Sequence, residues 1–187
     1  MRQQQRTLHE SLRSQTHATR QRVADLVRPL DLARLVEHPE PNAWSVADVL
    51  EHLCRTEDAY RDHIRAAIAG ARADAGAPAR EWKSSLIGGL IAESLIKPKP
   101  LKAPRVFRPG PTPRNGVLEC FLAQELTLLK YMDDAASLDW TAVRIGSPAL
   151  YAFMPKLNLG DVFRVHVVHA NRHAGQIERV AKKLRAQ

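Results

Sequence analysis

Three histidines near the end of the chain are spaced so that an α-helix would present them on one face. His166, His169 and His173 are three, four and seven residues apart, and residues at these separations share a helical face. The same stripe carries the apolar residues Val162, Ile177, Val180 and Leu184. Buried polar rings cost free energy unless each finds a partner, and one metal ion would satisfy two or three of them at once. The pattern therefore predicts a metal site inside a helical bundle.

A metal site of this kind needs a third ligand from another helix. His169 and His173 are one turn apart, which is a common way to present two imidazoles to one ion. His52 is suited to be the third because it flanks the apolar stripe of an earlier helix, and His63 competes because it lies further along the same side. Without a metal, His52 would be a partly buried histidine bonded to a carboxylate. The residues alone leave these alternatives open.

Helical periodicity accounts for most of the chain, and no segment alternates like a strand. Long helices are expected over residues 4–27, 45–70, 114–137 and 158–184. Shorter helices are expected over residues 31–37 and 81–96, the second weakened by Gly88 and Gly89. This pattern predicts an all-α protein with a four-helix bundle.

Two of the long helices begin with cap motifs. Ser45 is followed three residues later by Asp48, as in a capping box, and Asn158 is followed in the same way by Asp161. Pro29 ends or bends the first helix.

The connection between the second and third long helices is long, rich in proline and basic. Residues 97–110 contain no acidic residue and carry the basic residues Lys97, Lys99, Lys102, Arg105 and Arg108. Proline excludes a regular helix there, so we expect an extended strap. A helix of about 24 residues is about 36 Å long, and this connection can cross that length. The second and third long helices can therefore run parallel.

Bulk properties favour one globular domain over residues 1–187, with a basic surface. The chain has a formal net charge of +8, which raises nucleic acid as a partner, but the basic residues are spread along the chain outside the strap. Cys54 and Cys120 form no CxxC motif, which fits a reducing cytoplasm. We expect no membrane segment and no signal peptide, because the longest apolar stretch, 86–96, is short and interrupted by polar residues.

Two segments together resemble the DinB-like superfamily, which includes the YfiT-like proteins. Residues 44–53 match a W-S-x-x-x-x-x-x-H pattern that ends at His52, and residues 169–177 match H-x-x-R-H-x-x-Q-I. The Pro-rich segment 102–109 and the segment 157–160 before the last helix are also similar to this family. The resemblance covers most of the chain from Pro41 onward.

The resemblance implies a four-helix bundle in up-down-down-up order, often as a homodimer. It also implies a divalent metal ion, usually zinc or nickel, held by His52, His169 and His173. His166 has no ligand role in this pattern, and we expect it to support a ligand from the second shell or to line the pocket. We expect Gln176 to bond a helix end or a neighbour, and Arg172 to point toward solvent or an acid.

Three neutral imidazoles leave the charge of an ion uncompensated and at least one coordination position open, which suits catalysis. The resemblance favours an enzyme that activates a small-molecule thiol for transfer or isomerisation, with the strap recruiting an anionic thiol or substrate. A solvated connection is the alternative for the strap. The rival activity is a metal-dependent hydrolase with Glu57 or Glu125 as the base, and a non-catalytic stress-related binding module is the third alternative. Nucleic acid is disfavoured because no aromatic-basic interleaving is present.

Overall fold

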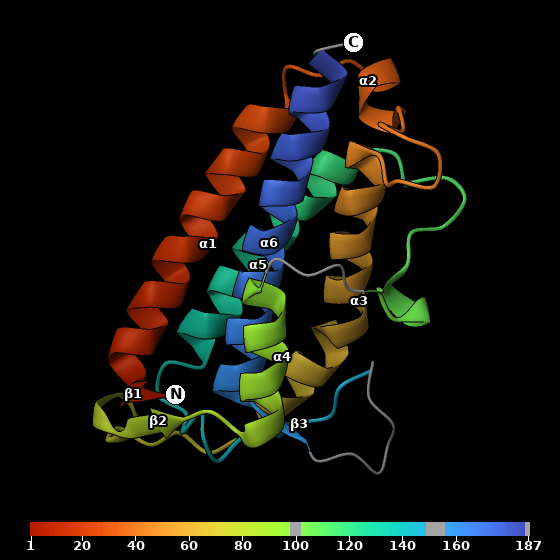
Figure 1. Cartoon of the computed structure of the whole chain (residues 1–187). Helices are drawn as coiled ribbons and strands as arrows, with labels where there is room; N and C mark the ends of the chain where they lie inside the picture. Colours follow the sequence, from red (N-terminus) through yellow and green to blue (C-terminus); the bar gives the residue numbers. More distant parts are fainter. Residues whose placement is uncertain (98–101, 149–155, 186–187) are drawn as a thin grey trace.

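Four long helices run along the length of the molecule (Figure 1). They are α1 (Gln5–Val27), α3 (Val46–Gly70), α5 (Val117–Asp134) and α6 (Leu159–Arg185). The computed structural model describes residues 1–97, 102–148 and 156–185. Helices α1 and α6 run in one direction and α3 and α5 in the other (Figure 1). The expected up-down-down-up bundle is therefore confirmed, with α3 parallel to α5.

Each long helix packs against two others. Helix α1 contacts α5 and α6, and α3 contacts the same two helices from the opposite side. The connection from α3 to α5 contains a further helix, α4 (Leu86–Ile96), which packs along α6. Part of the expected strap, residues 98–101, lies outside the described residues. No described helix combines the length and apolar character needed to cross a bilayer.

The close contact between α4 and α6 explains why α4 has a glycine at position 88. A Cβ atom on Gly88 would lie 2.2 Å from Cγ of Asp161 on α6, so only glycine fits there. The Asp161 carboxylate also accepts hydrogen bonds from Ser84 and from the Ser85 backbone, which joins the start of α4 to the start of α6. Gly88 therefore allows α4 to lie against α6, although glycine lowers helix propensity.

The expectation of no strands, and of a helix beginning at Glu81, is wrong. Strand β1 (Arg2–Gln4) pairs antiparallel with β2 (Glu81–Lys83), and β3 (Arg144–Ile145) pairs with β4 (Leu157–Asn158). Trp82 gives the reason for β2, because its side chain is fully buried and its indole N–H donates to Asn158 Oδ1 at 3.1 Å. This contact joins two segments that are far apart in the sequence, so no periodic pattern around residue 82 predicts the strand.

The cap motifs do what their spacing predicts. Ser45 and Asp48 form a complete capping box at the start of α3, and the side chain of Asn158 accepts from the Asp161 backbone N–H at 2.7 Å. Helix α1 ends at Val27, before Pro29, and the short helix α2 (Leu32–Val36) follows. Helix α5 begins at Val117, later than expected, after a left-handed Gly116 with φ 64°.

The bundle interior consists of two apolar clusters. One cluster includes Ile64 of α3 and Phe163 of α6, and the other includes Leu50 of α3 and Ile177 of α6. Between these levels the helices carry polar residues that are buried, or half-buried in the case of Glu57 and His169: Thr16 and Thr19 on α1, His52, Thr56 and Glu57 on α3, Gln124 and Glu125 on α5, and His166, His169 and His173 on α6. The bundle thus has a polar middle, which contains the histidines singled out above.

Candidate metal centre

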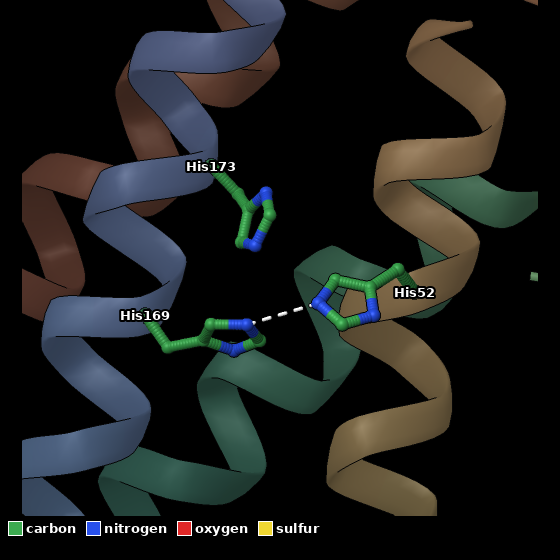
Figure 2. A group of neighbouring side chains, drawn as sticks. All are labelled: His52, His169 and His173. Atoms are coloured by element: carbon green, nitrogen blue, oxygen red, sulfur yellow. Dashed lines mark hydrogen bonds between the residues drawn. The ribbon is translucent and has the colours of Figure 1, made fainter. Parts of the chain in front are cut away.

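Helices α3 and α6 bring three histidines to one point inside the bundle. Because these helices run in opposite directions, His52 of α3 comes opposite His169 and His173 of α6 (Figure 2). One nitrogen from each ring lies within 4.8 Å of the others, and Nε2 of His52 is 2.9 Å from Nε2 of His169. His63, the competing residue on α3, is exposed and does not belong to this cluster. The ligand roles of the three rings stay predictions.

Hydrogen bonds behind the rings fix which nitrogen faces the centre. Nδ1 of His52 donates to the backbone carbonyl of Phe107 at 2.8 Å, and Nδ1 of His173 pairs with the side-chain oxygen of Gln176 at 2.8 Å. With Nδ1 carrying the proton, Nε2 of His52 and Nε2 of His173 each present a lone pair, and that of His52 accepts from Nε2 of His169. Outer hydrogen bonds of this kind orient metal-binding histidines and raise their basicity. Phe107 belongs to η2 (Arg105–Phe107), so the strap helps to position His52.

Burial keeps the three imidazoles neutral. Burial lowers the pKa of His52, and it lowers the pKa of His169 well below the usual value, with a further contribution from the neighbouring rings. Burial and His52 together lower the pKa of His173 to about 3. A metal ion binds the neutral form of imidazole, so protons do not compete for these nitrogens near neutral pH.

The donor set fits a divalent ion. Two imidazole nitrogens bound to one tetrahedral zinc ion at about 2.0–2.1 Å lie about 3.3 Å apart. The His52 and His169 nitrogens, at 2.9 Å, would need to separate by only a few tenths of an ångström to reach this distance. All three donors are nitrogens, which suit zinc, nickel, copper and iron. The structure contains no carboxylate in this cluster among the residues that it describes, so the ion would keep its positive charge.

Two further residues of α6 lie beside the cluster. Gln176 bonds a neighbour, His173, as expected. The expectation that Arg172 points to solvent or an acid is wrong, because its Nη1 donates to the carbonyls of Leu95 and Lys97 at the end of α4. Carbonyls at a helix C-terminus lack helical partners and attract cations, which explains the contact.

Trp44 is a neighbour of the cluster that the sequence did not reveal. Its indole centroid lies 5.0 Å from the His52 ring and 6.4 Å from the His173 ring. Its two signals in the sequence were its place just before the Ser45 cap and the tryptophan of the family pattern that ends at His52, and neither indicates a contact with the rings. The indole therefore covers one side of the histidine cluster and can report on events there.

A second polar group lies beside the first on the same two helices. Nδ1 of His166 donates to the Glu57 carboxylate, and the His166 side chain is only 2% exposed. The edge of Tyr60 packs on His166, with the centroids 4.7 Å apart. His166 Nε2 is buried and has no hydrogen-bond partner among the described residues, so no hydrogen bond joins His166 to the three clustered histidines. Its expected second-shell role stays a prediction.

Glu125 adds a second carboxyl to this region. Glu125 is buried, and its Oε2 has no hydrogen-bond partner in the described part of the chain. Burial and the nearby Glu57 raise the pKa of Glu125 well above its usual value, while Arg20 opposes the shift. Burial therefore favours the protonated form of Glu125, whereas Glu57 is the acidic side chain that is hydrogen-bonded to an imidazole.

Comparisons with known proteins agree with this architecture. The chain resembles the solved structure of YfiT from Bacillus subtilis, with a TM-score of 0.56, 12% sequence identity, and coverage of 94% of this chain and 87% of that one. YfiT is described as a probable metal-dependent hydrolase with an unusual four-helix bundle topology. No curated protein matches the sequence. The model of the DinB superfamily matches residues 15–177, and the chain therefore belongs to the DinB superfamily.

Proposed function

We propose that this protein is a divalent-metal-dependent hydrolase. The observation that carries the proposal is the convergence of three imidazoles within 4.8 Å, two of them buried and that of His169 half-buried, with His52 and His173 oriented from behind by Phe107 and Gln176. The description of YfiT as a probable metal-dependent hydrolase supports the same reaction class. His52, His169 and His173 would hold the ion, with zinc or nickel expected.

The chemistry supplied by such an ion is that of a Lewis acid, which lowers the pKa of water and polarises a carbonyl or phosphoryl oxygen. What the chain itself must provide is orientation of the rings and a place for the proton that hydrolysis releases. Phe107 and Gln176 provide the orientation, as described above.

Glu57 and His166 are suited to take up the proton. The Glu57 carboxylate accepts from Nδ1–H of His166 and leaves Nε2 with a free lone pair. A carboxylate behind an imidazole holds the ring in one tautomer and stabilises the imidazolium that forms when Nε2 accepts a proton. The sequence offers Glu57 and Glu125 as candidates for the general base of a hydrolase. Glu125 is less suited, because burial raises its pKa and so favours its protonated form, which cannot accept a further proton.

The basic strap favours an anionic substrate. Phe107, whose carbonyl holds His52, is followed by Arg108 and preceded in η2 by Arg105, and both arginines are exposed. Lys97 and Lys102 are exposed as well, while Lys99 lies outside the described residues. Charges of one sign beside a site raise the local concentration of oppositely charged substrates. A carboxylate- or phosphate-bearing ester is therefore the substrate class that we expect.

Thiol transfer and a binding role remain as alternatives that the same experiment tests. Thiol transfer rests on the family resemblance, and no contact in the described residues favours it over hydrolysis. The binding role predicts a salt-dependent interaction with duplex DNA and no turnover.

The test is a panel of anionic and neutral ester and amide substrates, assayed with the zinc- or nickel-loaded protein with and without an added thiol. We expect turnover without thiol, loss of turnover with a chelator, and a lower KM for anionic esters. Arg105→Gln together with Arg108→Gln should raise KM for the anionic ester and leave KM for its neutral counterpart unchanged. Turnover that needs a thiol would contradict hydrolysis, and equal KM shifts for both esters would contradict the role of the strap.

A further inference from the structure

Helix α4 lies outside the four-helix bundle and leaves part of its apolar surface uncovered (Figure 1). The buried side of α4 consists of two small residues, Gly88 and Ala92, and α4 packs along α6. Leu86 and Leu90 are also four residues apart and lie about 200° around the helix from this pair. These two leucines are 81% and 59% exposed. They therefore point away from the bundle on neighbouring turns of the helix.

Further exposed apolar residues lie at the end of α4 and on η2. Ile96 of α4 and Val106 of η2 are exposed, so four of the eight large apolar residues that are exposed in the described part of the chain belong to these two elements. Arg172 of α6 contacts the end of α4, and Phe107 of η2 contacts His52, so both elements reach the level of the histidine cluster. We call residues 83–97 and 102–108 the α4–strap surface. Exposed apolar patches of this kind mark interaction sites.

Basic side chains accompany the apolar residues of this surface. Lys83 precedes α4, Lys97 follows it, and the strap adds Lys102, Arg105 and Arg108, and all five residues are exposed. Among the described residues, none of the five forms an ion pair with a carboxylate, whereas arginines of α1 and α3 do. The α4–strap surface therefore presents positive charge that no described acidic residue of the chain neutralises.

This combination favours an anionic lipid bilayer over other partners of an apolar surface. A second copy of the chain would bring the same unpaired cations together, and like charges oppose such a contact. A helical peptide binds in an apolar groove, whereas leucines that are 81% and 59% exposed do not line one. A bilayer offers anionic headgroups and, about 5–10 Å below them, an apolar layer that accepts the outward side chains of a helix lying in its plane.

We propose that the α4–strap surface binds the protein reversibly to the surface of anionic bilayers. Leu86 and Leu90 insert below the lipid headgroups. Lys97 and Lys102 contact the lipid phosphates, and no helix has to cross the bilayer. Glu93, the one acidic residue of α4, lies three residues after Leu90 on the same outward face and is exposed, so it opposes the attraction. The proposal does not depend on the metal centre or on the hydrolase activity.

The test is co-sedimentation of the purified full-length chain with vesicles of phosphatidylcholine alone or of phosphatidylcholine mixed equally with phosphatidylglycerol. We expect the wild type to partition at least about tenfold more strongly into the mixed vesicles, and added NaCl to weaken this binding because salt screens the charges. Leu86→Ser together with Leu90→Ser should weaken binding about tenfold or more. The matched control, Leu32→Ser with Leu126→Ser, replaces two exposed leucines of α2 and α5 and should bind as the wild type does.

The contribution of charge is tested separately. Lys97→Gln together with Lys102→Gln should weaken binding to the mixed vesicles about tenfold and reduce its dependence on salt. Lys182→Gln with Lys183→Gln, at the end of α6, changes the net charge equally and should have little effect. Glu93→Gln removes the opposing charge of α4 and should strengthen binding.

Four results would overturn the proposal. The first is a wild type that stays in the supernatant with the mixed vesicles at low salt, and the second is equal partitioning into both kinds of vesicle. The third is a control pair that weakens binding as much as the matching pair on the α4–strap surface. The fourth is a dimer, seen by sedimentation velocity, that Leu86→Ser with Leu90→Ser abolishes, because a second copy would then cover the surface. The wild-type comparison decides the matter even where a variant, judged by far-UV circular dichroism, fails to fold.

Discussion

Helices α3 and α6 carry two polar groups in one bundle interior, and the two groups have opposite partners. In the first, His52, His169 and His173 face one another, with a carbonyl and an amide oxygen behind two of them and no carboxylate. In the second, His166 faces the carboxylate of Glu57. The first group favours neutral rings with free lone pairs, which bind a cation. The second pairs an imidazole N–H with an acidic side chain, an arrangement that fixes the orientation of the ring.

The difference suggests that two levels of the same helices have separate roles, metal binding at one level and proton uptake at the other. His52 and Glu57 are separated by about 1.4 turns of α3. Within this short distance the partner of the imidazole changes from a backbone carbonyl, at His52, to the carboxylate of Glu57, at His166. Had a carboxylate backed the metal-facing rings, they would bind protons more readily. Had His166 lacked Glu57, a proton arriving at its ring would be a buried, uncompensated charge. We expect substitutions to separate the two groups.

The largest expected effect is on metal affinity. His169→Ala removes the ring that contacts His52, and we expect zinc affinity to fall by more than the about 10–100-fold that the loss of an outer partner costs. Isothermal titration of the metal-free protein measures this, with His63→Ala, an exposed histidine of α3, as the matched control. Wild-type affinity in His169→Ala, or a comparable loss in His63→Ala, would show that the cluster is not the metal centre.

The next effect is on turnover and not on metal affinity. Glu57→Gln keeps the shape of the side chain but removes the charge behind His166, so kcat should fall by about 10²–10⁴-fold, as for the loss of a general base. Zinc affinity should stay close to that of the wild type. Glu119→Gln, on the exposed face of α5, is the control. If Glu57→Gln also loses its metal, the two groups are a single site and the division of labour is wrong.

Zinc affinity should depend weakly on pH. An imidazole with its usual pKa of about 6.5 costs about tenfold in affinity for each pH unit below that value. Burial lowers the pKa of all three rings, that of His173 to about 3, so protons compete with the ion less than they would at exposed imidazoles. We expect the affinity to fall by clearly less than about tenfold per ring and pH unit between about pH 7 and pH 5.

Quenching of Trp44 fluorescence by Ni²⁺ measures this affinity, because the indole lies 5.0 Å from the His52 ring. Trp44→Phe retains the other tryptophans and shows how much of the signal comes from Trp44. A tenfold loss per ring and pH unit would mean that the imidazoles titrate as exposed histidines do.

The smallest effect is on stability. The folded protein holds the proton of Glu125 because burial raises its pKa, whereas the unfolded chain releases it above about pH 4.5. The unfolded state then binds fewer protons, so Glu125 lowers the free energy of unfolding as the pH rises, by up to about 1.4 kcal/mol per pH unit. Glu125→Gln removes this penalty and should be more stable than the wild type in urea unfolding at pH 7. An equal gain at pH 4 would contradict the explanation.

The sequence predicts the parts of this structure that are local. The Ser45 and Asn158 caps, the stop before Pro29 and the shared face of His169 and His173 depend on neighbours within a turn or two, and they occur as expected. The length of the connection between α3 and α5 only permitted their parallel course, and the family resemblance implied it. Residues 98–101 of that connection lie outside the described residues, so its extended course stays a prediction.

What the sequence could not give are the contacts between distant segments. Trp82 lies in a strand and packs its indole against Gly160 of α6, with a hydrogen bond to Asn158 of β4. Phe107 holds His52 through a backbone carbonyl that carries no sequence signal. Glu57 was a candidate base, but only the packing of α3 on α6 shows that it faces His166. The helix pattern fixes which residues share a face, and side-chain packing fixes which faces meet.

The most direct test of the central claim is an anomalous difference map, recorded at the zinc absorption edge, from crystals of the protein grown with Zn²⁺. The account predicts one strong peak bonded to Nε2 of His52 and to ring nitrogens of His169 and His173, with Phe107 and Gln176 still behind their rings. A peak at other residues, or three ordered rings bonded only to protein groups and no peak between them, would contradict it.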